Sequence, residues 1–241
     1  MRIPTSVMSV TGSEWQDLYV CYSFGGFLSL LCLKNDFRES FGFLPCLIVY
    51  YMLYLCQEGE EMELQFSEIH DAGRAYRNRL FALYEATFPR AERKPVSSLE
   101  KTFSEGKNKI LAITEGEDFV GLAVVMTDGR LNLLDYLAID PAKRDRGYGG
   151  YALRHLLREY ADRPFVVEIE RPEEGAADNA QRLRRRAFYL ANGMESSGVC
   201  VRLFHVDYEL LCANGKVGYE EYHRLLTDCM GARVKPFLRE L

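Results

Sequence analysis

A basic, glycine-rich segment covers residues 139–150 of the 241-residue chain, between a predicted strand and a predicted helix. It reads Ile-Asp-Pro-Ala-Lys-Arg-Asp-Arg-Gly-Tyr-Gly-Gly. Closely spaced glycines let backbone N–H groups turn toward one point, and the N-terminus of a helix adds free N–H groups and partial positive charge. Lys143, Arg144 and Arg146 place formal positive charge around the same point. The segment therefore predicts a site for a pyrophosphate group.

Two other interpretations of this segment compete with a phosphate site. One is an ordinary solvated turn with a basic rim. The other is a dinucleotide-binding loop, because Gly-x-Gly-x-x-Ala over residues 147–152 fits that fingerprint and Glu168 or Glu170 follows about 20 residues later. Such a loop should follow its strand at once inside a parallel βαβ unit, whereas seven residues separate Ile139 from the first glycine. A nicotinamide site is therefore the less favoured interpretation.

Hydrophobic periodicity predicts the elements that hold this segment in place. Helices are expected at 72–87, capped by Asp71, at 97–103, capped by Ser97 or Ser98, and at 149–160, 180–191 and 219–229. Strands are expected at 63–69, 109–114, 119–126, 131–139, 165–169, 199–204 and 206–211. Short turns join three consecutive strands into an antiparallel meander, and a crossover helix follows. The order predicts a mixed α+β fold of the α/β class, with a central mixed, mostly antiparallel sheet flanked by helices.

Residues 1–61 differ in character from residues 62–241, which are predicted to form one domain. The first segment holds four of the seven cysteines but only three of the 30 Lys and Arg residues. Its uncharged run at 41–56 is shorter than the ~20 apolar residues of a spanning helix. The codons for Glu-Gly-Glu just before Met62 can read as a purine-rich ribosome-binding sequence. We therefore interpret residues 1–61 as an over-extended reading frame, with a hydrophobic membrane anchor and a genuine helical segment as the alternatives.

Composition restricts the partners and the compartment. The net charge of −5 argues against general coating of nucleic acid, so a polyphosphate must be held by local basic residues or backbone amides. The seven cysteines include no Cys-x-x-Cys pair, and no Cys/His cluster has zinc-finger spacing, which is typical of reduced thiols in a cytoplasmic protein. The sequence thus predicts no metal, no nucleic-acid partner, and no membrane contact unless residues 41–56 are translated. Whether the protein forms a homodimer is left open.

Two motifs together resemble the signatures of the GNAT superfamily of acetyl-CoA-dependent N-acetyltransferases. The first is Arg/Gln-x-x-Gly-x-Gly/Ala after a strand, matched by Arg144, Gly147 and Gly149. The second is an aromatic–Tyr pair near the end of a later helix, followed by a glycine, as in Phe-Tyr-Leu-Ala-Asn-Gly-Met over residues 188–194. The predicted element order is similar to that of the family over residues 62–211. The resemblance therefore implies the GNAT fold.

The resemblance also implies roles for particular residues. Backbone groups of Leu137 and Ile139, with Ala138 between them, would hold the pantetheine arm and polarise the acetyl carbonyl. Tyr189 would protonate the departing thiolate of coenzyme A. The amides implied to bind the pyrophosphate are those of Arg144, Asp145, Arg146, Gly147, Tyr148, Gly149 and Gly150.

The helix that carries the second motif departs from the family pattern. Arg182 stands where an Asn is frequent, Asn179 lies three residues before it, and Met194 replaces a common Phe. Arg182 also begins a basic run that continues at 184–186. A solvated or acid-paired helix face is the preferred interpretation of this run, and contact with an acidic substrate or the 3′-phosphate of the nucleotide is the alternative.

Acetyl transfer to an amine makes a general base useful. A lysine-like amine with pKa ~10.4 is mostly protonated at neutral pH, so a base must remove a proton directly or through water. Asp135 is expected to share a face with Leu137 and Ile139 by the two-residue period of a strand. Glu168 interrupts an apolar run, so its burial would raise its pKa toward the useful range, and Glu170 follows on the same strand. All three carboxylates are candidates, each with a solvent-facing or salt-bridged role as the alternative.

Taken together, the resemblance implies an acyltransferase that uses acetyl-CoA as co-substrate. It would transfer the acetyl group by direct attack to a primary amine of a small molecule or peptide. The alternative is a non-catalytic CoA-binding or regulatory module on the same fold. Residues from the first two helices shape the acceptor pocket in this family, and Phe-Pro-Arg-Ala-Glu-Arg at 88–93 carries no motif that identifies the amine.

Overall fold

The computed structural model describes residues 17–24, 27–34, 63–90 and 92–241, and the chain divides into two compact units between residues 61 and 62. In the first unit, β1 (Asp17–Phe24) pairs antiparallel with β2 (Phe27–Lys34). The uncharged run at 41–56 lies outside the described residues. Among the helices that are described, none combines the length and the apolar character that crossing a membrane requires.

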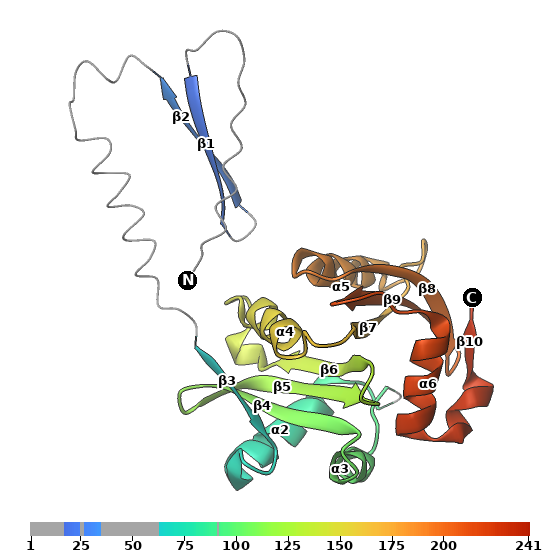
Figure 1. Ribbon diagram of the computed structural model, residues 1–241. Coiled ribbons are helices and arrows are strands. Elements are labelled where there is room, and N and C mark those ends of the chain that lie inside the picture. Colours follow the sequence, from blue (N-terminus) through green and yellow to red (C-terminus); the bar gives the residue numbers. More distant parts are fainter. Residues whose placement is uncertain (1–16, 25–26, 35–62, 91) are drawn as a thin grey trace. The chain divides into compact units, whose positions relative to one another are not determined.

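The second unit is built on an eight-stranded sheet with helices against it (Figure 1). The strand order is β10-β8-β9-β7-β6-β5-β4-β3, and only β6 and β7 are parallel neighbours. Its strands are β3 (Leu64–Glu68), β4 (Asn108–Glu115), β5 (Asp118–Thr127), β6 (Asn132–Ile139), β7 (Phe165–Glu170), β8 (Glu195–Leu203), β9 (Val206–Ala213) and β10 (Leu238–Glu240). Its helices are α2 (Gly73–Thr87), α3 (Val96–Ser104), α4 (Tyr148–Glu159), α5 (Asn179–Ala191) and α6 (Tyr219–Met230), with the 3₁₀ turns η2 (Pro141–Lys143) and η3 (Ala232–Phe237).

Each strand and helix predicted for residues 62–241 is present, with ends that differ by a few residues. The predicted fold class is confirmed, because the sheet is mixed, mostly antiparallel and flanked by helices. β10 was not predicted. It has only three residues and exists because it pairs with β8, a contact between distant parts of the chain that local periodicity does not report.

The predicted helix caps are wrong. Asp71 does not cap α2, because its N–H is bonded to the Glu68 carbonyl in the preceding turn and the helix begins after Ala72. α3 begins one residue earlier than expected, directly after Pro95. Pro95 is the N-cap residue, its carbonyl accepts the N–H groups of Ser98 and Leu99, and no serine side chain caps the helix.

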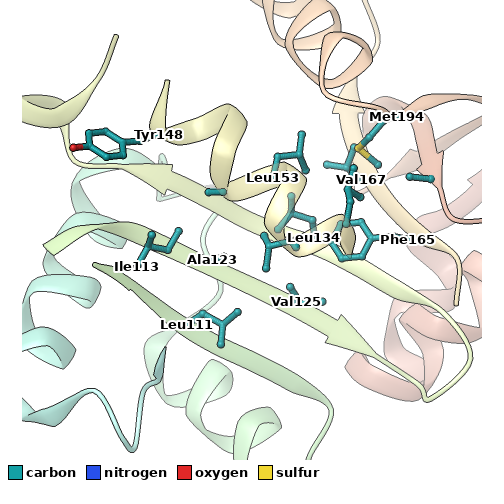
Figure 2. Close-up of a cluster of buried hydrophobic side chains, with 14 of the residues drawn as sticks. Leu111, Ile113, Ala123, Val125, Leu134, Tyr148, Leu153, Phe165, Val167 and Met194 are labelled. Atoms are coloured by element: carbon teal, nitrogen blue, oxygen red, sulfur yellow. The ribbon is translucent and has the colours of Figure 1, made fainter. Parts of the chain in front are cut away.

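Two layers of helices cover opposite faces of the sheet. On one face, Leu153 and Leu156 of α4 pack on strand residues such as Val125 and Val167, and all four are at most 3% exposed. Figure 2 shows Leu153, Val125 and Val167 among the side chains of this cluster, between α4 and the strands. Two further buried clusters lie on the other face, one under α2 and α3 and one under α6. The face covered by α4 and the face covered by α6 therefore carry separate cores.

The sheet opens between its two parallel strands. β6 and β7 pair only from Asn132 to Leu134 of β6, and neither strand continues the pairing beyond that point. On its other side β6 carries a β-bulge, because Val124 and Val125 of β5 pair with Tyr136 and Leu134 respectively and leave Asp135 without a partner. A bulge adds one residue to a strand and reverses the alternation of its side chains and backbone groups beyond that point. The opening and the bulge thus occur at the same level of β6.

Candidate active site

The opening leaves one backbone edge of β6 without a strand partner. The carbonyl of Ala138 faces Gly121 of β5 so closely that a Cβ at Gly121 would lie 2.3 Å from it. Because backbone groups alternate along a strand, those of Leu137 and Ile139 point the other way, into the opening. The Ile139 carbonyl there accepts a hydrogen bond from Arg144 Nε at 3.3 Å. The structure therefore directs the backbone groups of Leu137 and Ile139 into the opening, while the Ala138 carbonyl is directed toward β5.

The glycine-rich segment forms a curled loop at the start of α4. Asp145 and Gly147 have φ values of 63° and 82°, and such left-handed residues turn neighbouring N–H groups toward a common concave side. Within the described part of the chain, the N–H groups from Asp145 to Gly150 donate to no protein acceptor. The first helical bond is that of Tyr151 N–H to the Gly147 carbonyl. The loop is thus a row of free donors at the positive end of a helix dipole.

The basic residues of this loop are not equivalent. Lys143 Nζ lies 2.6 Å from the carboxylate of Asp118, so its charge is already paired. Arg144 and Arg146 are exposed, and neither makes an ion pair with a described residue. The loop therefore has two guanidinium groups without a carboxylate partner among the described residues, beside its unpaired amides.

Gly150 allows the start of α4 to approach the end of α5, whereas Gly149 leaves ordinary van der Waals distance. A Cβ at Gly149 would lie 3.6 Å from the Phe188 ring, and a Cβ at Gly150 would lie 2.8 Å from Asn192 Oδ1. Asn192 also accepts a hydrogen bond from Arg154 of α4. The sequence indicated Asn192 only as a helix stop, and nothing in its local pattern distinguishes this contact. The close approach brings the second motif next to the first.

Tyr189 lies on α5 beside this contact. Its ring packs against the cluster under α4, and its hydroxyl has no hydrogen-bond partner among the described residues. Burial raises the pKa of Tyr189 to about 12, while the nearby Arg185 acts in the opposite direction. The phenol is therefore protonated at neutral pH and has a proton to donate.

Glu168 lies where the opening between β6 and β7 begins, one residue beyond the last β7 residue that pairs with β6. The pKa of Glu168 is raised to about 7, chiefly by burial and also by the neighbouring Asp135, while Lys94 acts in the opposite direction. The hydroxyl of Tyr222 on α6 donates to Glu168 Oε1 at 2.7 Å and also lowers this pKa. A carboxyl group that titrates near neutral pH can act as a general base. The sequence predicted Glu168 but missed Tyr222, which carries no motif beyond its place on the apolar side of a helix.

The other two candidate carboxylates are paired with cations. The prediction that Asp135 shares a face with Leu137 and Ile139 is wrong, because the bulge at Asp135 reverses the alternation between them. Asp135 instead binds Lys94 Nζ at 2.6 Å, and Lys94 also contacts Met126 in the cluster under α6. It therefore lies on the same side of the sheet as Tyr222.

Glu170 is held by the basic run of α5. Its carboxylate lies 2.9 Å from Arg182 and 4.0 Å from Arg185. Arg186 pairs with Glu209 at 2.8 Å. The prediction that the basic run is paired with acidic residues is thus confirmed for Arg182, Arg185 and Arg186. The side chain of Asn179 is also engaged within the protein, because its Oδ1 accepts a hydrogen bond from the Glu173 N–H at 3.0 Å.

Several solved structures are similar to this chain. A protein of Bacteroides thetaiotaomicron described as a GNAT-family acetyltransferase has a TM-score of 0.57 and 23% identity, over 70% of this chain and 99% of that chain. An aminoglycoside 6'-N-acetyltransferase complexed with coenzyme A has a TM-score of 0.48 and 16% identity, over 62% of this chain and 96% of that chain. The ribosomal-protein-S18-alanine N-acetyltransferase of Escherichia coli has a TM-score of 0.44 and 16% identity, over 65% of this chain and 96% of that chain. No protein-family model and no curated sequence matches the chain. The first of these likenesses shows that the chain has the GNAT fold, as its two motifs predicted.

Proposed function

We propose that this protein is an acetyl-CoA-dependent N-acetyltransferase that acetylates a primary amine of a small molecule or peptide. The observation that carries the proposal is the row of unpaired N–H groups from Asp145 to Gly150, which starts a helix beside an opening in the sheet. Such a row binds phosphate oxygens without needing a large net positive charge. It is therefore compatible with the negative net charge of the chain.

The residues present fit coenzyme A. The amides from Arg144 to Gly150 would bind the pyrophosphate, with Arg144 and Arg146 adding charge. The backbone groups of Leu137 and Ile139 would bind the pantetheine arm, which is an extended chain of amides and can pair with a free strand edge. Acetyl-CoA supplies the activated acetyl thioester when bound.

Two side chains are suited to the proton transfers. Glu168 would take a proton from the ammonium group of the acceptor, directly or through water, so that the nitrogen can bond to the acetyl carbon. As the carbon–sulfur bond breaks, Tyr189 would give its proton to the leaving sulfur, and the second proton released by the nitrogen as the amide forms would restore the Tyr189 hydroxyl, directly or through water. Tyr189 packs on the α4 side of the sheet, whereas Glu168 binds Tyr222 on the α6 side. The amine and the thioester would therefore meet in the opening from opposite faces.

The test is release of free thiol from acetyl-CoA by the purified full chain, measured against a panel of diamines, amino sugars and peptides with free N-termini. We expect turnover with at least one class and saturable binding of acetyl-CoA by calorimetry. Binding without turnover on any amine would favour the non-catalytic CoA-binding module. An absence of binding, or preference for NADH, would refute the proposal.

A matched pair of variants separates the acid from a buried aromatic. Tyr189 and Tyr160 both pack on the cluster under α4, and burial raises the pKa of each to about 12. Neither hydroxyl donates to a described residue. Tyr160→Phe should leave turnover unchanged, because Tyr160 ends α4 with its ring against Phe165 and belongs to neither motif.

A further inference from the structure

The C-terminal helix α6 follows the strands that the family resemblance covers, and it packs directly against the strand that carries Glu168. Tyr222, Leu225 and Leu226 are at most 1% exposed and form part of the cluster with Val166 of β7 and Leu210 of β9. In Figure 1, α6 lies along the strands near the end of the sheet that carries β9 and β10. Its apolar residues account for the packing, but they leave the hydroxyl of Tyr222 unexplained.

That hydroxyl has one partner. Tyr222 is 0% exposed, and its hydroxyl donates to Glu168 Oε1 at 2.7 Å. Burial beside a carboxylate raises the pKa of Tyr222 well above its ordinary value, so the phenol keeps its proton and acts as the donor. Among the described residues, Glu168 Oε2 accepts no hydrogen bond. One oxygen of the carboxylate is thus fixed and the other is left for a ligand.

We propose that Tyr222 is a positioning residue that orients the Glu168 carboxylate by a hydrogen bond to Oε1. Through this residue, α6 contributes to the acyl-transfer site. The inference rests on the proposed function, because it assumes that Glu168 is the base. The position of Glu168 supports it, since this is the first β7 residue beyond the pairing with β6. Beyond that point β7 pairs, among the described strands, only with β9, where Glu168 lies opposite Leu210, so the strand holds the backbone of Glu168 and a side chain must restrain its carboxylate. Tyr222 is that restraint.

The charged and titratable groups that face Glu168 come from four elements. They are Asp135 of β6, Lys94 of the segment before α3, Tyr208 of β9 and Tyr222 of α6. Asp135 and Lys94 bind each other at 2.6 Å, so their opposite effects on Glu168 partly cancel. Tyr222 is the group that donates a hydrogen bond to Glu168 among the described residues. Removing the Tyr222 hydroxyl is therefore the most direct way to change the pKa of the Glu168 carboxyl group.

The test is a direct titration of Glu168 in the full chain by NMR of glutamate labelled with ¹³C at the side-chain carboxyl, which requires no acceptor. Glu168→Gln assigns the resonance. Tyr222→Phe removes a hydrogen bond to the charged carboxylate, so it should raise the titration midpoint by about one pH unit or more. Tyr219→Phe is the control on the same helix, because its hydroxyl donates to the Leu238 carbonyl and not to Glu168.

The result that would overturn the inference is an unchanged midpoint in Tyr222→Phe. If that variant does not fold, difluorotyrosine at position 222 keeps the shape and donates more strongly, so it must move the midpoint to lower pH. The acidic limb of kcat/KM should shift by the same amount as the midpoint. A shift by NMR without a shift of this limb would instead refute Glu168 as the base, which separates failure of the proposed function from failure of the Tyr222 contact.

Discussion

Replacing Glu168 by Gln should stabilise the protein while removing its activity. Burial raises the pKa of Glu168 to about 7 from an ordinary value of 4.5. The folded state therefore holds a proton more tightly than the unfolded state, and stability is lost as pH rises from about 4.5 to about 7. A shift of this size corresponds to a cost of about 3 kcal/mol above pH 7. Glutamine has no proton to lose and its amide oxygen can still accept the hydrogen bond from Tyr222.

The assay is chemical denaturation of both forms at pH 5 and pH 8. The two free energies of unfolding should nearly agree at pH 5, and at pH 8 the variant should be more stable by about 3 kcal/mol. Glu174→Gln, at an exposed position after β7, is the control and should leave the difference between the two pH values unchanged. Equal stabilities of wild type and Glu168→Gln at pH 8 would refute the burial of this carboxyl group, whatever happens to turnover.

Three other substitutions test the remaining parts of the site. Gly150→Ala would place a Cβ 2.8 Å from a side-chain oxygen at the end of α5, so calorimetry should show acetyl-CoA binding weakened at least about tenfold. Unaltered affinity would contradict the role of the loop. Tyr189→Phe should lower kcat by about 10²-fold or more and leave acetyl-CoA affinity intact, because only the proton for the leaving sulfur is lost. Unchanged turnover would remove the proposed acid. Lys94→Met leaves Asp135 unpaired and removes a charge that lowers the pKa of Glu168, so the acidic limb of kcat/KM should move to higher pH. A limb that stays in place would exclude the electrostatic coupling.

Local sequence patterns were enough to predict the elements of residues 62–241 apart from β10 and the two 3₁₀ turns, and also the loop at the start of α4. Apolar periodicity reports which side of a helix or strand is buried, and glycines beside basic residues report an anion site, because both effects act over a few neighbouring residues. Glu168 was predicted for the same reason, since a charged residue within an apolar run must be desolvated or paired. The family resemblance added the roles of Tyr189 and of the β6 backbone.

Only the tertiary structure determines which of the three candidate carboxylates has no cationic partner. The bulge at Asp135 depends on how β6 pairs with β5, and it turns this residue away from Leu137 toward Lys94. Glu170 is paired because α5 folds back onto β7. Tyr222 reaches Glu168 across 54 positions of sequence. Each of these contacts depends on strand register or on packing between distant elements, and a local pattern contains neither.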